Sequence, residues 1–230
     1  MLISHRLTAR AIHAVWRRLE FWGSVAPGTD KADEFGTFGR RSMITFPYAA
    51  LFGCAEIHLG EDTLIGRHCS LSVGYGDDDP SLPQRGLVIG DRCVIGQRAT
   101  ITAHESIEIG DDVWFGQDVF VSDSGHGYQD PETPIGVQWG ERSPVLIGAG
   151  SWVGHGAILL PGTRLGRNTV VAAGSVVRGE FPDHAVIGGV PARVLRRFEP
   201  GLGWAPASGE GEVRPIWRHE DVERLLSGEA

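Results

Sequence analysis

A repeat of six residues is the feature that most constrains this chain of 230 residues. From residue 87 the sequence reads LVIGDR, CVIGQR and ATITAH, and from residue 145 it reads VLIGAG, SWVGHG, AILLPG, TRLGRN, TVVAAG and SVVRGE. A period of six fits neither the 3.6-residue helix nor one long alternating strand, so it predicts short strands separated by turns. The third place of each hexad is aliphatic or aromatic, and glycine or a small residue usually follows it: Ile89, Ile95, Ile101, Phe115, Val121, Ile147, Val153, Leu159, Leu165, Val171, Val177.

Three such strands per coil predict an all-β, triangular solenoid. The third-place residues would stack inward as ladders, and the recurring glycines would supply corner backbone angles that other residues resist. The first place of the hexads is small or β-branched, and Cys69 and Cys93 fall there. We therefore interpret these two cysteines as small core residues. An odd number of cysteines without a CxxC pair favours a reducing compartment, which makes the cytoplasm the expected location.

Two segments interrupt the repeat, at 75–86 and 125–144. A solenoid tolerates insertions as loops leaving one corner, and such loops often form binding sites. The second loop follows the stretch SDSGHG, which places His126 at its root. We expect residues 41–197 to form the β-helix domain.

The ends of the chain lack the repeat. Residues 1–40 are expected to be a helical segment, with a basic helix carrying Arg6, Arg10, Arg17 and Arg18. Such a helix could lie on a membrane surface, but its short apolar face favours packing on the main domain or on a neighbouring subunit. Residues 198–230 are expected to be a tail that starts as a Gly/Pro-rich linker and ends in a short helix. No segment is long and apolar enough to predict a membrane span, and none resembles a signal peptide.

The formal net charge of −8 excludes a broad basic surface, so we do not expect nucleic acid as a partner. Small polar or activated substrates fit better.

The hexads over about residues 55–180, followed by GGVPAR with Gly189, Pro191 and Arg193, resemble the hexapeptide acyltransferases. The runs IGDDVWFGQDVFVSDSGHGYQD and PVLIGAGSWVGHGAILLPG are similar to maltose, galactoside and nodulation O-acetyltransferases and to acetyltransferases of surface-polysaccharide clusters. The resemblance implies a left-handed parallel β-helix, a homotrimer with active sites between subunits, and acetyl-CoA as acyl donor without a metal. It also implies that His126 is the catalytic base.

The chemistry agrees with that role. Transfer of an acetyl group from a thioester to an alcohol requires removal of the hydroxyl proton as the oxygen attacks, and neutral imidazole is a suitable base near pH 7. The resemblance places the oxyanion donor at a backbone amide near Gly154 and His155, with Trp152 lining the acceptor or pantetheine side. It places the pantetheine along Ala172, Ala173 and Gly174.

Other candidate residues carry weaker signals. Arg164 and Arg193 are candidates for the CoA phosphates, and only Arg193 lies in a family motif. Asp123 could orient the imidazole or bind an acceptor hydroxyl, and it could equally cap a turn. Arg98 stands near where the sugar acetyltransferases place an asparagine, so it could bind an acidic group of the acceptor or point to solvent. His104 lies beside the repeat without a partner motif, and we expect no role for it.

Alternatives to an O-acyltransferase are an N-acetyltransferase acting on an amino sugar or an antibiotic, and a β-helix that serves only as a scaffold. A γ-class carbonic anhydrase is disfavoured because the segment GHGAILLPG has Leu160 where that family has its second zinc-binding histidine.

Overall fold

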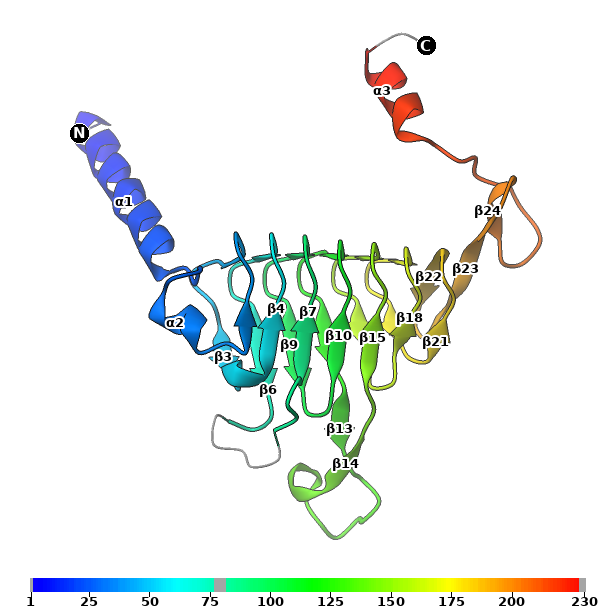
Figure 1. Cartoon of the computed structure of the whole chain (residues 1–230), viewed down its shortest axis with the longest axis horizontal. Coiled ribbons are helices and arrows are strands. Elements are labelled where there is room, and N and C mark those ends of the chain that lie inside the picture. Colours follow the sequence, from blue (N-terminus) through cyan, green and yellow to red (C-terminus); the bar gives the residue numbers. More distant parts are fainter. Residues whose placement is uncertain (1, 77–81, 228–230) are drawn as a thin grey trace.

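The computed structural model describes residues 2–76 and 82–227, so the middle of the expected loop at 75–86 and the last residues of the tail lie outside the described residues. Two helices come first, α1 (Leu2–Gly23) and α2 (Asp30–Asp33), and they are followed by a coil of short parallel strands (Figure 1). Short 3-10 turns lie at Cys54–Glu56 and Ile135–Val137, and the last helix is α3 (His219–Ser227).

Three sheets make up the coil. Sheet B contains, in spatial order, β1 (Thr37–Phe38), β4 (Ile57–Leu59), β7 (Leu87–Ile89), β10 (Ile107–Ile109), β15 (Val145–Ile147), β18 (Arg164–Leu165) and β21 (Glu180–Phe181). Sheet A contains β2 (Met43–Ile44), β5 (Leu64–Ile65), β8 (Val94–Ile95), β11 (Trp114–Phe115), β16 (Trp152–Val153), β19 (Val170–Val171), β22 (Ala185–Gly189), β23 (Ala192–Glu199) and β24 (Gly203–Pro206). Sheet C contains β3 (Ala50–Phe52), β6 (Ser70–Val73), β9 (Thr100–Ala103), β12 (Phe120–Ser122), β17 (Ile158–Leu159) and β20 (Val176–Val177).

The chain visits sheets B, A and C in turn, and within each sheet the strands of successive coils pair in parallel up to β22. This path is a three-sided β-helix, which confirms the repeat-based prediction of a parallel β solenoid. The three lines of corners are named here by the sheets that they join: the B/A edge, the A/C edge and the C/B edge.

The core is the ladder that the hexads predict. Every third-place residue identified in the sequence is at most 4% exposed, and Cys69 and Cys93 in the first place are completely buried. Burial raises the pKa of the Cys69 thiol to about 11, so this thiol is a core group rather than a nucleophile. Hydroxyl residues in the first place donate to backbone carbonyls, as Thr163 does to the carbonyls of Leu160 at 2.7 Å and Val177 at 2.9 Å. These bonds satisfy polar groups that would otherwise be buried at a cost.

The glycines after the third place have a different role from the expected one. Gly116 and Gly154 are not in the left-handed region, but a Cβ on either would lie 2.6 Å from a backbone nitrogen of the next coil. Close stacking of coils therefore requires glycine there.

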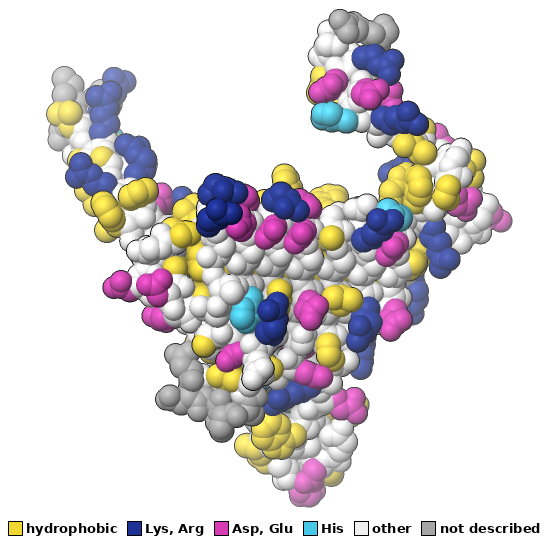
Figure 2. Space-filling model, in the orientation of Figure 1, with side chains coloured by type: hydrophobic (Ala, Val, Ile, Leu, Met, Phe, Trp, Pro, Cys, Tyr) yellow, Lys and Arg dark blue, Asp and Glu magenta, His cyan; other side chains and the backbone are white. Residues whose placement is uncertain are grey.

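The left-handed corners of the later coils are held by glycines at the sixth place, as expected, such as Gly150 and Gly156 with φ of 71° and 67°. On earlier coils charged residues hold them, such as Arg92 and Asp112 with φ of 55° and 58°. Those two residues form an ion pair between coils at 2.7 Å. In Figure 2, dark blue basic and magenta acidic side chains alternate along the upper edge of the coil.

Both insertions leave the C/B edge, because each lies between a strand of sheet C and the next strand of sheet B. The second one is not an irregular loop. It begins and ends as an antiparallel hairpin of β13 (Ser124–His126) and β14 (Trp139–Arg142) that projects from the coil (Figure 1). Insertion at one corner lets the hairpin form without disturbing the ladder.

The C-terminal boundary differs from the expected one. Strand β23 continues beyond residue 197, and β24 pairs with it antiparallel, so sheet A closes with a meander where a linker was expected. The buried backbone of Gly203 and the ring pair of Phe198 and Trp204, with centroids 5.6 Å apart, hold this meander together. Helix α3 agrees with the short helix predicted from the sequence.

A substitution of Gly116 by alanine should destabilise the coil by about 1–3 kcal/mol, because the added methyl group would press on the backbone nitrogen of His155. A thermal or urea unfolding curve measures this effect. Gly136→Ala is the matched control, since Gly136 has open space around its Cβ position and no left-handed backbone. Equal stability of the two variants would contradict the close-stacking explanation.

Candidate active site

His126 lies at the end of β13, exposed, at the meeting point of two pockets. The first pocket, of about 360 Å³, extends toward the later coils and is lined by Ser143, Leu160, Pro161 and Arg178 as well as by the start of the hairpin. The second, of about 300 Å³, extends toward the earlier coils, between Tyr75 and the hairpin residues 136–139. Within the part of the chain that the structure describes, the His126 imidazole forms no hydrogen bond or ion pair. Both faces of a candidate base are thus open to ligands.

A polar and aromatic cluster holds the root of the hairpin against the coil. The His104 ring lies beside Tyr75, with centroids 4.6 Å apart, and its Nδ1 lies 2.8 Å from the Ser124 hydroxyl. Arg142 donates to the carbonyl of His104 at 2.9 Å and stacks over Trp139, 5.6 Å from the ring centroid. These contacts join residues from the first insertion, the coil and the hairpin, and so define the position of His126.

Asp123 has neither of the two active-site roles considered for it, which were to orient the His126 imidazole and to bind an acceptor hydroxyl. It is completely buried, and its carboxylate accepts hydrogen bonds from the backbone amides of His104, Glu105 and Ser106 at 2.8 Å each. A carboxylate bonded to three amides inside the fold cannot reach an acceptor hydroxyl. The structure corrects that expectation and supports the turn-capping alternative, with the amides of the neighbouring coil as partners.

The residues expected to contact the pantetheine do come together, along the A/C edge. The Gly154 amide donates to the carbonyl of Val171, and the Gly174 amide donates to the carbonyl of His155, so these two coils are adjacent. Gly154 therefore has no free amide. The amides of His155 and Ala173, by contrast, form no hydrogen bond with any described residue. The edge thus presents a row of unpaired backbone donors, which suits binding of carbonyl oxygens.

Trp152 lies on the outer face of sheet A, 54% exposed, and pairs in register with the 58% exposed Trp114. Met43 and Leu64 lie on earlier strands of the same face, and both are more than a third exposed. Together they form an apolar row on sheet A. Arg193 lies at the end of this sheet, on β23, with its guanidinium bonded to the carbonyl of Ala192 at 2.8 Å.

Arg98 was expected near the acceptor and Arg164 near the CoA phosphates. Arg98 lies on the A/C edge, away from His126, and its guanidinium forms two bonds with Asp118 at 2.6 and 2.7 Å. That contact holds the pKa of Asp118 below its ordinary value, and Asp118 in turn lies 3.7 Å from Nδ1 of His155. Arg164 projects from sheet B and lies 3.8 Å from Glu180, a full face away from the amide row. The phosphate-binding role of Arg164 stays a prediction, because the resemblance places the CoA site between subunits.

Within one chain, His126 and the amide row lie on different edges of the prism, with sheet C between them. Residues 157–160 cross that face in extended conformation, and at about 3.3 Å per residue they alone span about 10 Å. A base must lie within about 3 Å of the proton that it removes. One chain therefore does not bring the two halves of the expected site together.

Several residues of this site carried no sequence signal. His104, Tyr75, Trp139 and Arg142 are separated along the chain and meet only because both insertions leave the same edge. Arg178 is a hexad residue like many others, and only the coil geometry places it beside the hairpin. Exposed aromatic residues within the insertions were the one available hint.

Comparisons with known proteins agree with this geometry. Residues 144–179 match the family described as bacterial transferase hexapeptide (six repeats), and residues 86–117 match the hexapeptide repeat of succinyl-transferase. The putative lipopolysaccharide biosynthesis O-acetyl transferase WbbJ of Escherichia coli is 39% identical over 87 residues, which cover 35% of this chain and 44% of that protein. The galactoside O-acetyltransferase of Lactococcus lactis is 28% identical over 164 residues, covering 71% of this chain and 64% of that protein.

The chain thus carries hexapeptide repeats of the kind found in bacterial transferases, and it is similar to O-acetyltransferases over part of its length. It spans less than two thirds of the length of these curated relatives. A solved structure of a mutant of AntD, an N-acyltransferase of Bacillus cereus, in complex with dTDP and coenzyme A, has a TM-score of 0.60 with 19% identity. The match covers 87% of this chain and 95% of that chain, which shows a shared fold.

The role of Asp123 in the fold can be tested by replacing it with asparagine. We expect Asp123→Asn to lower the free energy of unfolding by about 2–4 kcal/mol, because the NH₂ group of the new side chain would face backbone N–H donors and could not accept from them. Chemical denaturation measures the change. Asp33→Asn, at an exposed aspartate on α2, should stay within about 0.5 kcal/mol of wild type. A stable Asp123→Asn protein with weakened acceptor binding would instead support a substrate role.

Proposed function

We propose that this protein transfers an acyl group, in the simplest case acetyl, from CoA to a hydroxyl of a sugar or surface-glycan intermediate. The observation that carries the proposal is the position of His126, an exposed imidazole held by a braced hairpin where two pockets meet. The relatives named as O-acetyltransferases support an alcohol as the acceptor. We also propose that the coil winds left-handed, because the resemblance to the hexapeptide acyltransferases implies this winding.

His126 would act as general base in a complex that holds both substrates. Its neutral nitrogen takes the proton of the acceptor hydroxyl while the hydroxyl oxygen attacks the thioester carbonyl carbon. The carbon–sulfur bond then breaks, and the imidazolium returns the proton to the leaving thiolate, so that the products are an ester and free CoA thiol. No covalent enzyme intermediate is needed. The unpaired amide of His155 would stabilise the oxyanion, because a fixed donor requires no reorganisation as the charge develops.

The site would be completed by a second copy of the chain. His126 on the C/B edge of one copy would meet the amide row and Trp152 of its neighbour, which removes the distance across sheet C. The apolar row on sheet A, with Trp114 and Trp152 more than half exposed, supplies a surface that a neighbouring subunit would cover. A homotrimer with three such sites satisfies closed symmetry, as the resemblance implies.

The acceptor would bind in the pocket lined by Tyr75 and Trp139, whose rings contact each other edge to face with centroids 6.4 Å apart. Both side chains are mostly exposed, and aromatic faces suit the C–H surfaces of a pyranose ring. The pocket toward Arg178 would then take the thioester end of the donor. An amine acceptor would use the same base. The N-acyltransferase AntD shares this fold, but at 19% identity that likeness does not favour an amine.

The role of His126 is tested with acetyl-CoA and a panel of sugars, glycan fragments and amino sugars, by measuring the thiol released. His126→Ala should reduce kcat by about 10²- to 10⁴-fold while CoA still binds, because only proton transfer is lost. His219→Ala, at an exposed histidine on α3, is the control and should keep full activity. Wild-type turnover that is unchanged in His126→Ala would remove His126 from the mechanism. Turnover with amines alone would replace the alcohol with an amine acceptor.

The site between subunits is tested by mixing two inactive variants. Ala173→Trp should block the amide row and abolish CoA binding, whereas His126→Ala lacks the base. Trimers formed from both variants at equal amounts should regain about a quarter of wild-type activity, because each site takes its two halves from different subunits. A mixture of the two variant trimers that is kept from exchanging subunits is the control. No recovery in verified mixed trimers would show that each site lies within one chain.

A further inference from the structure

Helix α1 stands clear of the coil. It rises from the first coil and points away from it, on the side opposite to the hairpin (Figure 1). Among the described residues of α1, those of its last turns touch the body: Glu20 forms an ion pair with Arg67 at 2.7 Å, and Gly23 packs against the ring of Phe46. The expectation that α1 packs on the main domain of the same chain is therefore wrong. The contacts nevertheless fix the base of the helix to the coil.

One face of α1 is apolar and uncovered. Five side chains lie within an arc of about 120° at the helical spacing of 100° per residue. Each is at least 45% exposed: Ile12, Val15, Trp16, Leu19 and Trp22. Two of the five are tryptophans, which favour the boundary between lipid and water. So large an uncovered stripe requires an occupant.

The opposite face of α1 carries arginines, with the exposed Phe21 and Leu7 between Arg10 and Arg18 on the helical wheel. Arg6, Arg10 and Arg17 lie within about 40° of one another on the helical wheel, and Arg18 flanks the apolar arc. The helix carries four arginines and a single acid, Glu20, which already pairs with Arg67. Its net charge is therefore +3, and because the whole chain has −8, the other residues carry −11. Figure 2 shows the dark blue and yellow side chains gathered on the projecting helix.

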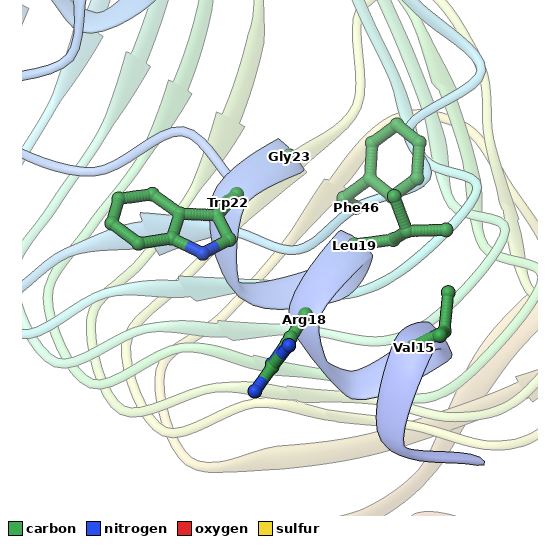
Figure 3. A pocket seen from close by; sticks show the side chains of 6 residues that line it. All are labelled: Val15, Arg18, Leu19, Trp22, Gly23 and Phe46. Atoms are coloured by element: carbon green, nitrogen blue, oxygen red, sulfur yellow. The ribbon is translucent and has the colours of Figure 1, made fainter. Parts of the chain in front are cut away.

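The apolar face continues onto the coil. A pocket of about 460 Å³ lies at the base of α1 and is lined by Val15, Leu19, Trp22 and Phe46. Figure 3 looks onto this face of the helix, with Val15, Leu19 and Phe46 toward one flank and Arg18 and Trp22 toward the other. The groove offers space for an acyl chain or another apolar group where the helix meets the coil.

We propose that α1 lies on an anionic lipid surface, with its tryptophan-containing face in the boundary region and its arginines attracted to the headgroups. The charge decides between occupants. Anionic lipid complements the +3 helix, whereas a bundle of identical helices would bury the apolar faces and leave the arginine stripes on its outside without acidic partners. None of the described helices is long and apolar enough to cross a bilayer, so the helix would lie in the interface. The proposal does not depend on the acyl-transfer activity.

The test is flotation of the full-length protein with vesicles of phosphatidylcholine, made with or without phosphatidylglycerol. We expect binding to the anionic vesicles and little binding to phosphatidylcholine alone, with a loss of affinity as salt rises. Arg6→Gln/Arg10→Gln should weaken binding by roughly 30-fold. Ile12→Ser/Trp16→Ser should weaken it by about tenfold or more.

Two matched controls change the same residue types elsewhere. Arg197→Gln/Arg218→Gln removes two exposed arginines outside the helix, and Ile216→Ser/Trp217→Ser removes an exposed isoleucine and tryptophan from the tail. Both should bind as wild type does. Circular dichroism and light scattering on every variant report folding and subunit number.

Three outcomes would overturn the proposal. The first is absence of wild-type binding to anionic vesicles. The second is binding that the controls weaken as much as the helix variants do. The third is a fall in subunit number in Ile12→Ser/Trp16→Ser with lipid binding unchanged, which would make a second copy the occupant of this face.

Discussion

The close stacking of neighbouring coils is the constraint on which the rest of the structure depends. A Cβ at Gly116 or Gly154 would lie 2.6 Å from the backbone of the next coil, so these two places must hold glycine. The same spacing brings the third-place side chains into unbroken contact and lets Thr163 donate to carbonyls of its own coil and the next. The core, the hydrogen bonds and the glycines are thus three results of one geometry.

A prism built in this way has little room for chemistry on its faces, because alternate residues of every strand are used for packing. Reactive groups therefore depend on places where the repeat is broken or where backbone amides are left unpaired. The hairpin provides the first, and it is secured by Asp123, whose buried carboxylate bonds to three amides of the neighbouring coil. The A/C edge provides the second, at His155 and Ala173. The two places lie on different edges, which makes assembly of copies a direct consequence of the proposed chemistry.

Charge is also divided between parts of the chain. The coil pairs its charged corner residues across coils, as in Arg98 with Asp118 and Arg92 with Asp112. Those pairs are exposed and contribute little stability each, but they leave few unpaired charges on the corners. Helix α1 differs, since it carries four arginines and a single acidic residue, Glu20, which pairs with Arg67 of the coil. A surface of opposite charge is what this helix lacks within the chain.

The sequence by itself determined the ladder, because a period of six allows only one set of side chains to point inward, and all of the predicted third-place residues are buried. It also determined that His126 lies at an insertion, since a broken repeat is visible along the chain. It left Asp123 open between an active-site role and a turn cap, and it overlooked His104. The side-chain hydrogen-bond partners of both come from neighbouring coils, 17 to 20 residues away, and no local pattern records them. Only the tertiary structure decided which edge each group occupies. The edge depends on how many residues separate each group from its corner of the coil. Arg164 therefore faces away from the amide row, and within one chain His126 lies far from the amides that it would need.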